Sequence, residues 1–139
     1  MKTIKYIITG FVMLFWLLLS HVSLAHWNHH SDIKTWAQDH KYLVVKKRIM
    51  PINPIGLFCE LMTEDAVYFV LYNEEGKYIG QTSPFICHPA WFDTGFTFPG
   101  EHYSIDTDSF IVLDDKNIEA LTISTKQKRW WSKILAVVN

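Results

Sequence analysis

The pattern of apolar and polar positions divides the chain at about residue 25. Two lysines, Lys2 and Lys5, precede an almost unbroken apolar run from Ile7 to Leu19, and the small residues Ser23 and Ala25 follow it. A positive start, an apolar middle and a small-residue end are typical of an export signal, cleaved here after Ala25. We therefore expect the rest of the chain to lie outside the cytoplasm.

The same segment also fits a membrane anchor that is retained. Ile7 through Ala25 comprises 19 residues, close to the roughly 20 that a transmembrane helix needs. Trp27 then follows as an aromatic residue suited to the membrane interface. Both alternatives keep Lys2 and Lys5 inside and direct the C-terminal part outward. The sequence thus predicts a signal peptide or a single transmembrane anchor over residues 1–25.

Residues 26–40 are polar with scattered aromatic side chains. A cap at residues 31–32 can start a short helix that carries Ile33, Trp36 and Ala37 on one side. The same stretch can instead be a polar stem that links the first segment to a folded domain. Both alternatives stay open for this segment.

From residue 41 onward, short β-rich runs alternate with turn residues. The run Ala66–Tyr72 is apolar on both faces, which predicts a central strand, and Asn73 to Gly76 predicts a tight turn after it. Residues 129–138 allow a strand or a helix, and their β-branched end favours a strand. The other predicted runs are Tyr42 to Met50, Ile55 to Met62, Lys77 to Gln81, Phe110 to Leu113 and Ile118 to Ser124.

This layout predicts a mainly β fold, a small antiparallel sandwich or barrel-like sheet of about seven or eight short strands. Without residues 1–25 the chain has 114 of its 139 residues, which is the size of one ordinary domain. We expect that single β-rich domain to span residues 41–139. An N-terminal apolar helix and a short polar stem precede it.

Two cysteines, Cys59 and Cys87, both follow the first segment. An even number of cysteines in an oxidising compartment predicts a disulfide bond. Closing a loop of about 28 residues stabilises a fold by on the order of 3 to 4 kcal/mol in the chain-entropy model. A Cys-x-x-Cys spacing, which would favour a redox or metal pair, is absent.

Net charge gives no indication of a nucleic-acid partner. Without Lys2 and Lys5, the 13 basic residues fall to 11 against 14 acidic ones, whereas phosphate binding needs a positive excess. Neither Gly-x-Ser-x-Gly nor His-Glu-x-x-His occurs in the chain. Acid–base groups around Glu101 and His102 are better explained as solvated turn residues. We therefore predict a protein that is not an enzyme, without catalytic residues and without a resident cofactor.

Histidines provide the one candidate for metal chemistry. Cleavage after Ala25 would give His26 a free amine and an imidazole, two nitrogens placed to chelate copper, and a second imidazole would complete the site. This geometry is similar to that of copper proteins with an N-terminal histidine. A periplasmic copper- or zinc-binding protein is thus the alternative function. Its candidate ligands are His26, His29, His30, His88 and His102.

Aromatic residues form the stronger candidate for a binding surface. Consecutive tryptophans on a strand face opposite sides, so one member of the pair Trp130–Trp131 is expected at the surface. Exposed aromatic side chains anchor protein interfaces, while packing under loops is the structural alternative. The candidate surface consists of Trp91, Phe92, Phe96, Phe98, Trp130 and Trp131.

An apolar first segment, a polar stem and a small disulfide-bridged β-domain resemble the layout of many bacterial envelope proteins. These include immunity proteins against toxins delivered into the periplasm. The resemblance implies an envelope-associated or immunity-type role, with another envelope or secreted protein as partner. It implies a location in the periplasm or on the outer face of the inner membrane, or secretion after cleavage and release. A retained first segment would add the membrane itself as a partner.

Overall fold

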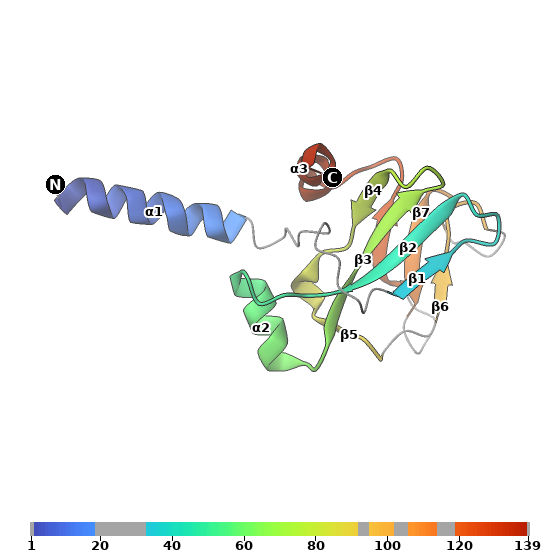
Figure 1. Cartoon of the computed structure of the whole chain (residues 1–139), viewed down its shortest axis with the longest axis horizontal. Coiled ribbons are helices and arrows are strands. Elements are labelled where there is room, and N and C mark those ends of the chain that lie inside the picture. The colour runs from blue at the N-terminus through green and yellow to red at the C-terminus, as the bar shows by residue number, and fades with distance from the viewer. Residues whose placement is uncertain (1, 19–32, 92–94, 102–105, 114–118, 139) are drawn as a thin grey trace.

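The computed structural model describes residues 2–18, 33–91, 95–101, 106–113 and 119–138. These residues form three α-helices and eight antiparallel strands in two sheets, together with one short 3-10 helix. Figure 1 shows the sheets in the body of the molecule and the first helix projecting from it. The predicted antiparallel, mainly β character is confirmed, and helices contribute more of the fold than the sequence indicated.

The larger sheet has five strands, with β3 at its centre. Strand β3 is buried along most of its length, as the two apolar faces of its sequence predicted. The strand order is β1-β2-β3-β4, and β5 pairs with the start of β3. The strands are β1 (Ile33–Trp36), β2 (Tyr42–Arg48), β3 (Ala66–Asn73), β4 (Tyr78–Gln81) and β5 (His88–Pro89).

The smaller sheet packs on one face of the larger one. It consists of β6 (Gly95–Thr97), β7 (Ser109–Leu113) and β8 (Glu119–Ser124). Phe69 of β3 lies in the core between the sheets, where its ring centroid is 5.6 Å from that of Phe96 and 6.3 Å from that of Phe110. We call this side of the larger sheet its inner face.

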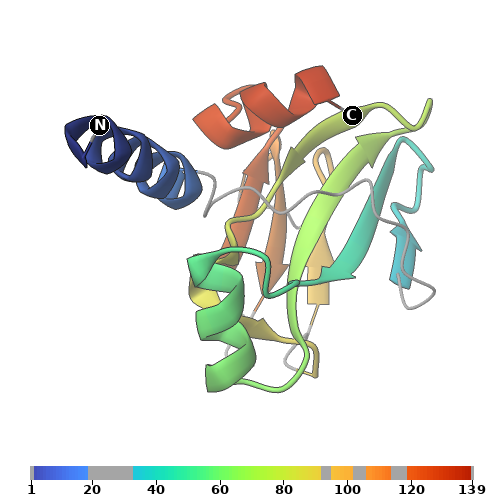
Figure 2. The ribbon, with the colours of Figure 1, turned by 60° about the vertical axis from the view of Figure 1, so that its left-hand side comes forward.

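Two helices cover the opposite, outer face of the larger sheet. Helix α2 (Pro54–Met62) and helix α3 (Trp130–Val138) contribute Cys59, Trp131 and Leu135 to a core that also contains Tyr68 of β3. Figure 2 shows both helices, green and red, alongside the strands. The fold therefore has three layers, with the larger sheet in the middle.

Of the two alternatives for residues 129–138, the favoured strand is wrong and the helix is correct, because Trp130–Val138 form α3. Trp131 and Leu135, which lie four residues apart, are buried together, and that spacing fits a helix rather than a strand. The Trp131 Nε1 donates a hydrogen bond to the Gln81 carbonyl at 3.2 Å. Val137, in the β-branched end of the segment, is 86% exposed. It does not pack in a sheet, so its β-propensity does not decide the local structure.

The predicted strand at residues 55–62 is also wrong, because these residues lie in α2. The Asn53 side chain accepts a hydrogen bond from the Gly56 N–H at 2.7 Å, and Pro54 occupies the first turn. An asparagine cap followed by proline is a favourable helix start. A Cβ on Gly56 would lie 2.1 Å from the Met50 carbonyl oxygen, so glycine permits the close approach to the preceding segment.

Residues 33–36 form a strand instead of the predicted short helix or stem. Strand β1 pairs with β2, with Ile33 opposite Lys46 and Trp36 opposite Leu43. The open edge of β2 supplies backbone partners along the whole of β1, which outweighs a weak local helix signal. Residues 26–32 of the predicted stem lie outside the described residues.

The predicted disulfide bond between Cys59 and Cys87 is confirmed, with Cα atoms 5.0 Å apart. It joins α2 to the segment that contains the 3-10 helix η2 (Pro84–Ile86). The predicted turn after β3 is also confirmed, since Gly76 has a positive φ of 76° and donates its N–H to the Asn73 carbonyl at 3.0 Å.

Helix α1 (Lys2–Leu18) contacts the body through a hydrogen bond from the Trp16 Nε1 to the Ile52 carbonyl at 3.2 Å. Within the described part of the chain, no helix is both long enough and apolar enough to cross a membrane. The predicted signal or anchor segment continues to residue 25, and its residues 19–25 lie outside the described residues.

Candidate functional site

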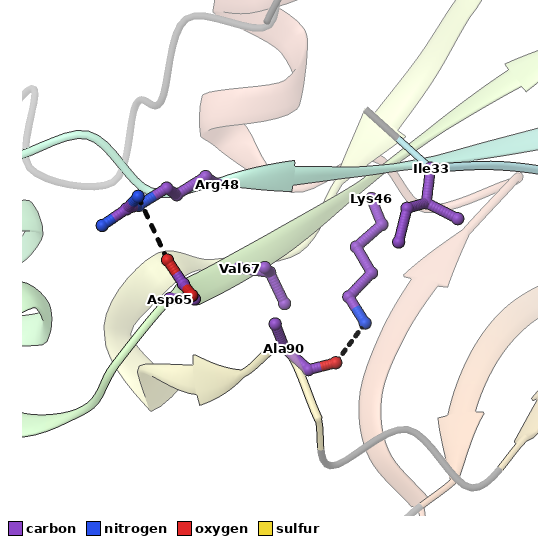
Figure 3. Close-up of a pocket in the computed structure, with 6 residues that line it drawn as sticks. All are labelled: Ile33, Lys46, Arg48, Asp65, Val67 and Ala90. Atoms are coloured by element: carbon purple, nitrogen blue, oxygen red, sulfur yellow. Dashed lines mark hydrogen bonds and ion pairs between the residues drawn. The ribbon is translucent and has the colours of Figure 1, made fainter. Parts of the chain in front are cut away.

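A cavity of about 240 Å³ opens near the end of β2. Figure 3 shows side chains from three strands, from the turn before β3 and from the segment after β5 around it. Its lining residues are Ile33, Lys46, Arg48, Asp65, Val67 and Ala90. We call this cavity the β1 pocket, because the first residue of β1 forms one wall.

Strand register explains why these residues meet. Ile33 pairs with Lys46 across β1 and β2, and Arg48 pairs with Val67 across β2 and β3. Directly opposite residues point to the same face of a sheet, and alternate residues of one strand share that face. Since Val67 belongs to the core on the inner face, the β1 pocket opens on the inner face as well.

The charged groups of the β1 pocket are paired. The Lys46 Nζ donates a hydrogen bond to the Ala90 carbonyl. The Arg48 guanidinium bridges two carboxylates, at 3.1 Å from Asp65 and 3.0 Å from Glu60. Because these partners are partly exposed, the ion pairs contribute little to stability. They fix the arginine at the rim and leave Ile33, Val67 and Ala90 as apolar walls.

Strand β1 forms an open edge of the larger sheet, since β2 is its one neighbour among the described strands. Ala37 donates its backbone N–H to the Tyr42 carbonyl at 2.9 Å, which sets the alternation of the antiparallel ladder. By that alternation, the backbone N–H and C=O groups of Lys34 and Trp36 point away from β2. The side chains of Ile33 and Trp36 are 59% and 45% exposed.

Trp91 belongs to the same region by its position in the chain. It directly follows Ala90 of the β1 pocket, and its side chain is 76% exposed. We use the term β1 edge for strand β1, the β1 pocket and Trp91 together. This surface combines outward-pointing backbone groups, a small cavity and exposed aromatic side chains.

The structure does not bring the predicted aromatic surface together. Phe98 is 4% exposed and Trp131 is 7% exposed, so both are core residues on opposite sides of the larger sheet. Phe96 is half-buried against Phe110, at 5.7 Å between ring centroids. Trp130 is 44% exposed, but it lies on α3. Phe92 lies outside the described residues. Of the six residues of the predicted aromatic surface, Trp91 is therefore the described one that belongs to the β1 edge.

The histidine hypothesis remains a prediction. Four of its candidate ligands, His26, His29, His30 and His102, lie outside the described residues. His88 is 4% exposed and packs edge-on against Phe69 at 5.7 Å. In the part of the chain that the structure describes, no group of three or more His, Cys, Asp or Glu residues is placed to hold a metal ion.

Carboxylates in and near the Glu101–His102 segment stabilise local turns. Glu101 accepts a hydrogen bond from the Phe98 N–H at 3.0 Å. Asp106 accepts one from the Ser109 hydroxyl at 2.7 Å, and this bond lowers the pKa of Asp106 below its usual value. Asp108 forms an ion pair with Lys126 at 2.6 Å. Glu101, Asp106 and Asp108 therefore take part in separate turn contacts and ion pairs.

Sequence reasoning missed the apolar outer side of α2. Leu57, Phe58, Leu61 and Met62 are all exposed, and their spacing places them on one side of a helix. The signal was present in the sequence, but a strand assignment distributes the same residues over two faces.

Comparison with known protein families gives a match over nearly the whole chain. Residues 1–135 match a family described as "Family of unknown function (DUF6201)". No curated protein and no solved structure matches the chain.

Proposed function

The chain belongs to the DUF6201 family, a family of unknown function, and we propose that it is a non-enzymatic envelope protein that binds another protein through the β1 edge. The partner contributes an extended segment that adds to the larger sheet beside β1. Strand addition of this kind derives affinity from backbone hydrogen bonds and specificity from pockets for side chains.

The observation that carries this proposal is the open edge of β1 next to a pocket of side-chain size. Lys34 and Trp36 direct backbone donors and acceptors outward, and exposed sheet edges are templates for strand pairing. The β1 pocket, at about 240 Å³, is smaller than the roughly 300–1,000 Å³ of typical small-molecule sites. It therefore suits a single side chain of a partner better than a cofactor.

The chemistry of the pocket indicates which side chain it accepts. Its walls of Ile33, Val67 and Ala90 favour an apolar group. The exposed indole of Trp91 adds contact area beside the pocket.

Two features of the chain support a location in the envelope. The first segment has the order of an export signal or anchor, and the disulfide between Cys59 and Cys87 requires an oxidising compartment to persist. The periplasm or the outer face of the inner membrane meets both conditions. An immunity-type role, in which the partner is a delivered toxin, is the specific form of this proposal.

Photo-crosslinking in the native host cells tests the β1 edge. p-Benzoylphenylalanine in place of Trp36 should give a discrete protein adduct, and a second substitution, Lys34→Pro, should abolish it by removing an outward N–H. The matched control Lys34→Ala removes the same side chain and keeps the N–H, so it should retain the adduct. Equal amounts of adduct in the Lys34→Pro and Lys34→Ala variants would contradict the strand-addition mechanism. Absence of the adduct both with Lys34 in place and with Lys34→Ala would show that the β1 edge is not the interface.

A further inference from the structure

Helix α2 directs a broad apolar face outward. Leu57 and Leu61 lie one turn apart on the helix, as do Phe58 and Met62, and the four side chains are 50%, 74%, 50% and 64% exposed in that order. The buried residues of α2 are Gly56 and Cys59. An exposed apolar face of this width costs solubility and therefore indicates a binding surface.

The disulfide extends this face beyond the helix. It holds η2 against α2, and η2 adds Phe85 and Ile86, which are 49% and 59% exposed. We call the six residues Leu57, Phe58, Leu61, Met62, Phe85 and Ile86 the apolar patch. None of the six carries a charge, and the one charged residue of α2, Glu60, is paired with Arg48 at 3.0 Å.

Helix α1 meets the body next to α2. The Trp16 Nε1 donates to the Ile52 carbonyl at 3.2 Å, two residues before α2 begins. Large apolar side chains of α1 from Ile4 to Trp16 are exposed as well. In both Figure 1 and Figure 2, α1 meets the body beside α2.

We propose that the apolar patch docks the folded domain on a lipid bilayer, with its side chains in the interfacial region next to α1. The inference rests on the proposed envelope location and is independent of the β1 edge. The patch lacks charge and lies next to a helix with exposed apolar side chains, so it favours the acyl boundary of a bilayer over anionic headgroups. In both views β1 lies on the side of the body away from α1, so lipid docking leaves the β1 edge open to a partner.

Site-specific crosslinking to lipid tests this docking on the full chain. p-Benzoylphenylalanine replaces Leu61 in one variant and Trp91 in a control variant, whose positions are 74% and 76% exposed. On vesicles of zwitterionic phosphatidylcholine, the variant at position 61 should form lipid adducts and the variant at position 91 should not. Absence of lipid adducts at position 61, or equal amounts at both positions, would overturn the proposal. A chain-to-chain adduct at position 61 would overturn it too, by assigning the patch to a second copy.

Vesicle partitioning gives a second measurement. The double variant Leu61→Ser/Met62→Ser should lower the partition coefficient on phosphatidylcholine vesicles about tenfold, because two apolar side chains no longer enter the interface. Trp91→Ser should leave it unchanged, and raising the salt concentration should not weaken binding. A double variant that partitions like the wild type contradicts the proposal. Failure of the β1 edge to bind a partner would leave these vesicle results untouched, so the two proposals fail separately.

Discussion

Removing the disulfide should destabilise the domain and release α2 first. In the double variant Cys59→Ala/Cys87→Ala, the unfolded chain regains the freedom of a loop with a sequence separation of 28. The chain-entropy model gives a loss of about 3 to 4 kcal/mol in the free energy of unfolding. That loss is a large part of the roughly 5 to 15 kcal/mol that holds a typical domain together.

The structure also predicts which element is destabilised most when the disulfide is removed. Helix α2 buries few of its own side chains and packs mainly on η2. The disulfide links α2 to Cys87, which directly follows η2. Strand β3, in contrast, is buried on both faces. Hydrogen exchange in α2 should therefore accelerate far more than exchange in β3, because α2 opens locally without the cross-link.

Urea denaturation of the wild type and the double variant measures the global change. Reduced wild-type protein is the control, since it keeps both cysteine side chains and separates loss of the cross-link from loss of Cys59 packing. A destabilisation below about 1 kcal/mol would refute the loop-entropy argument. Equal acceleration of exchange in α2 and β3 would refute the claim that the disulfide chiefly holds α2.

Four further variants test core packing, helix capping and the burial of Tyr78. Trp131→Ala should cost about 3 to 5 kcal/mol in urea denaturation, since it empties a core site, whereas Trp91→Ala should stay within about 0.5 kcal/mol; equal costs would contradict their assigned burial. Asn53→Ala should cost about 1 kcal/mol by removing the cap of α2, and no change in α2 exchange would contradict that role. Burial raises the pKa of Tyr78 to about 12, so from pH 10 to 12 its proton is lost in the unfolded chain but kept in the folded one. Wild-type stability should fall by about 2 to 3 kcal/mol relative to Tyr78→Phe over that window, and parallel pH profiles would rule this out.

The local pattern of apolar residues predicted the central strand, which is buried along most of its length. Residues 66–72 are apolar at successive positions, which only a strand covered on both sides requires, and β3 lies at the centre of the larger sheet. The turn at Asn73 was predicted because glycine at position 76 supplies the positive φ that the turn demands. Each of these signals depends on residues close together in the chain.

Helix α2 escaped prediction, and the helix alternative for α3 was not the favoured one, because nine residues contain few turns. Over such a length the helical and strand periods are hard to separate. In α2 the apolar face is exposed, so the spacing of its apolar residues does not indicate which side of the segment is buried. In α3 the buried pair Trp131 and Leu135 gives the helical spacing, but the β-branched Val137 outweighed it in the sequence.

The β1 edge was predictable only in part. Trp91 was named as a member of the candidate aromatic surface. The pocket, however, joins Lys46 to Ala90, which lies 44 residues later in the chain, and joins Ile33 to Lys46 through the register of β1. Register and strand order depend on the whole sheet, so neither contact follows from the local sequence.

Residue-resolved hydrogen exchange of β1 in the complex tests strand addition most directly, with the partner identified by crosslinking at position 36. The backbone N–H groups of Lys34 and Trp36 point outward, and that of Thr35 points to β2 by the alternation of the ladder. We predict that partner binding slows exchange at Lys34 and Trp36 by at least tenfold and leaves Thr35 nearly unchanged. Unchanged exchange at Lys34 and Trp36 in a saturated complex would contradict the proposed function.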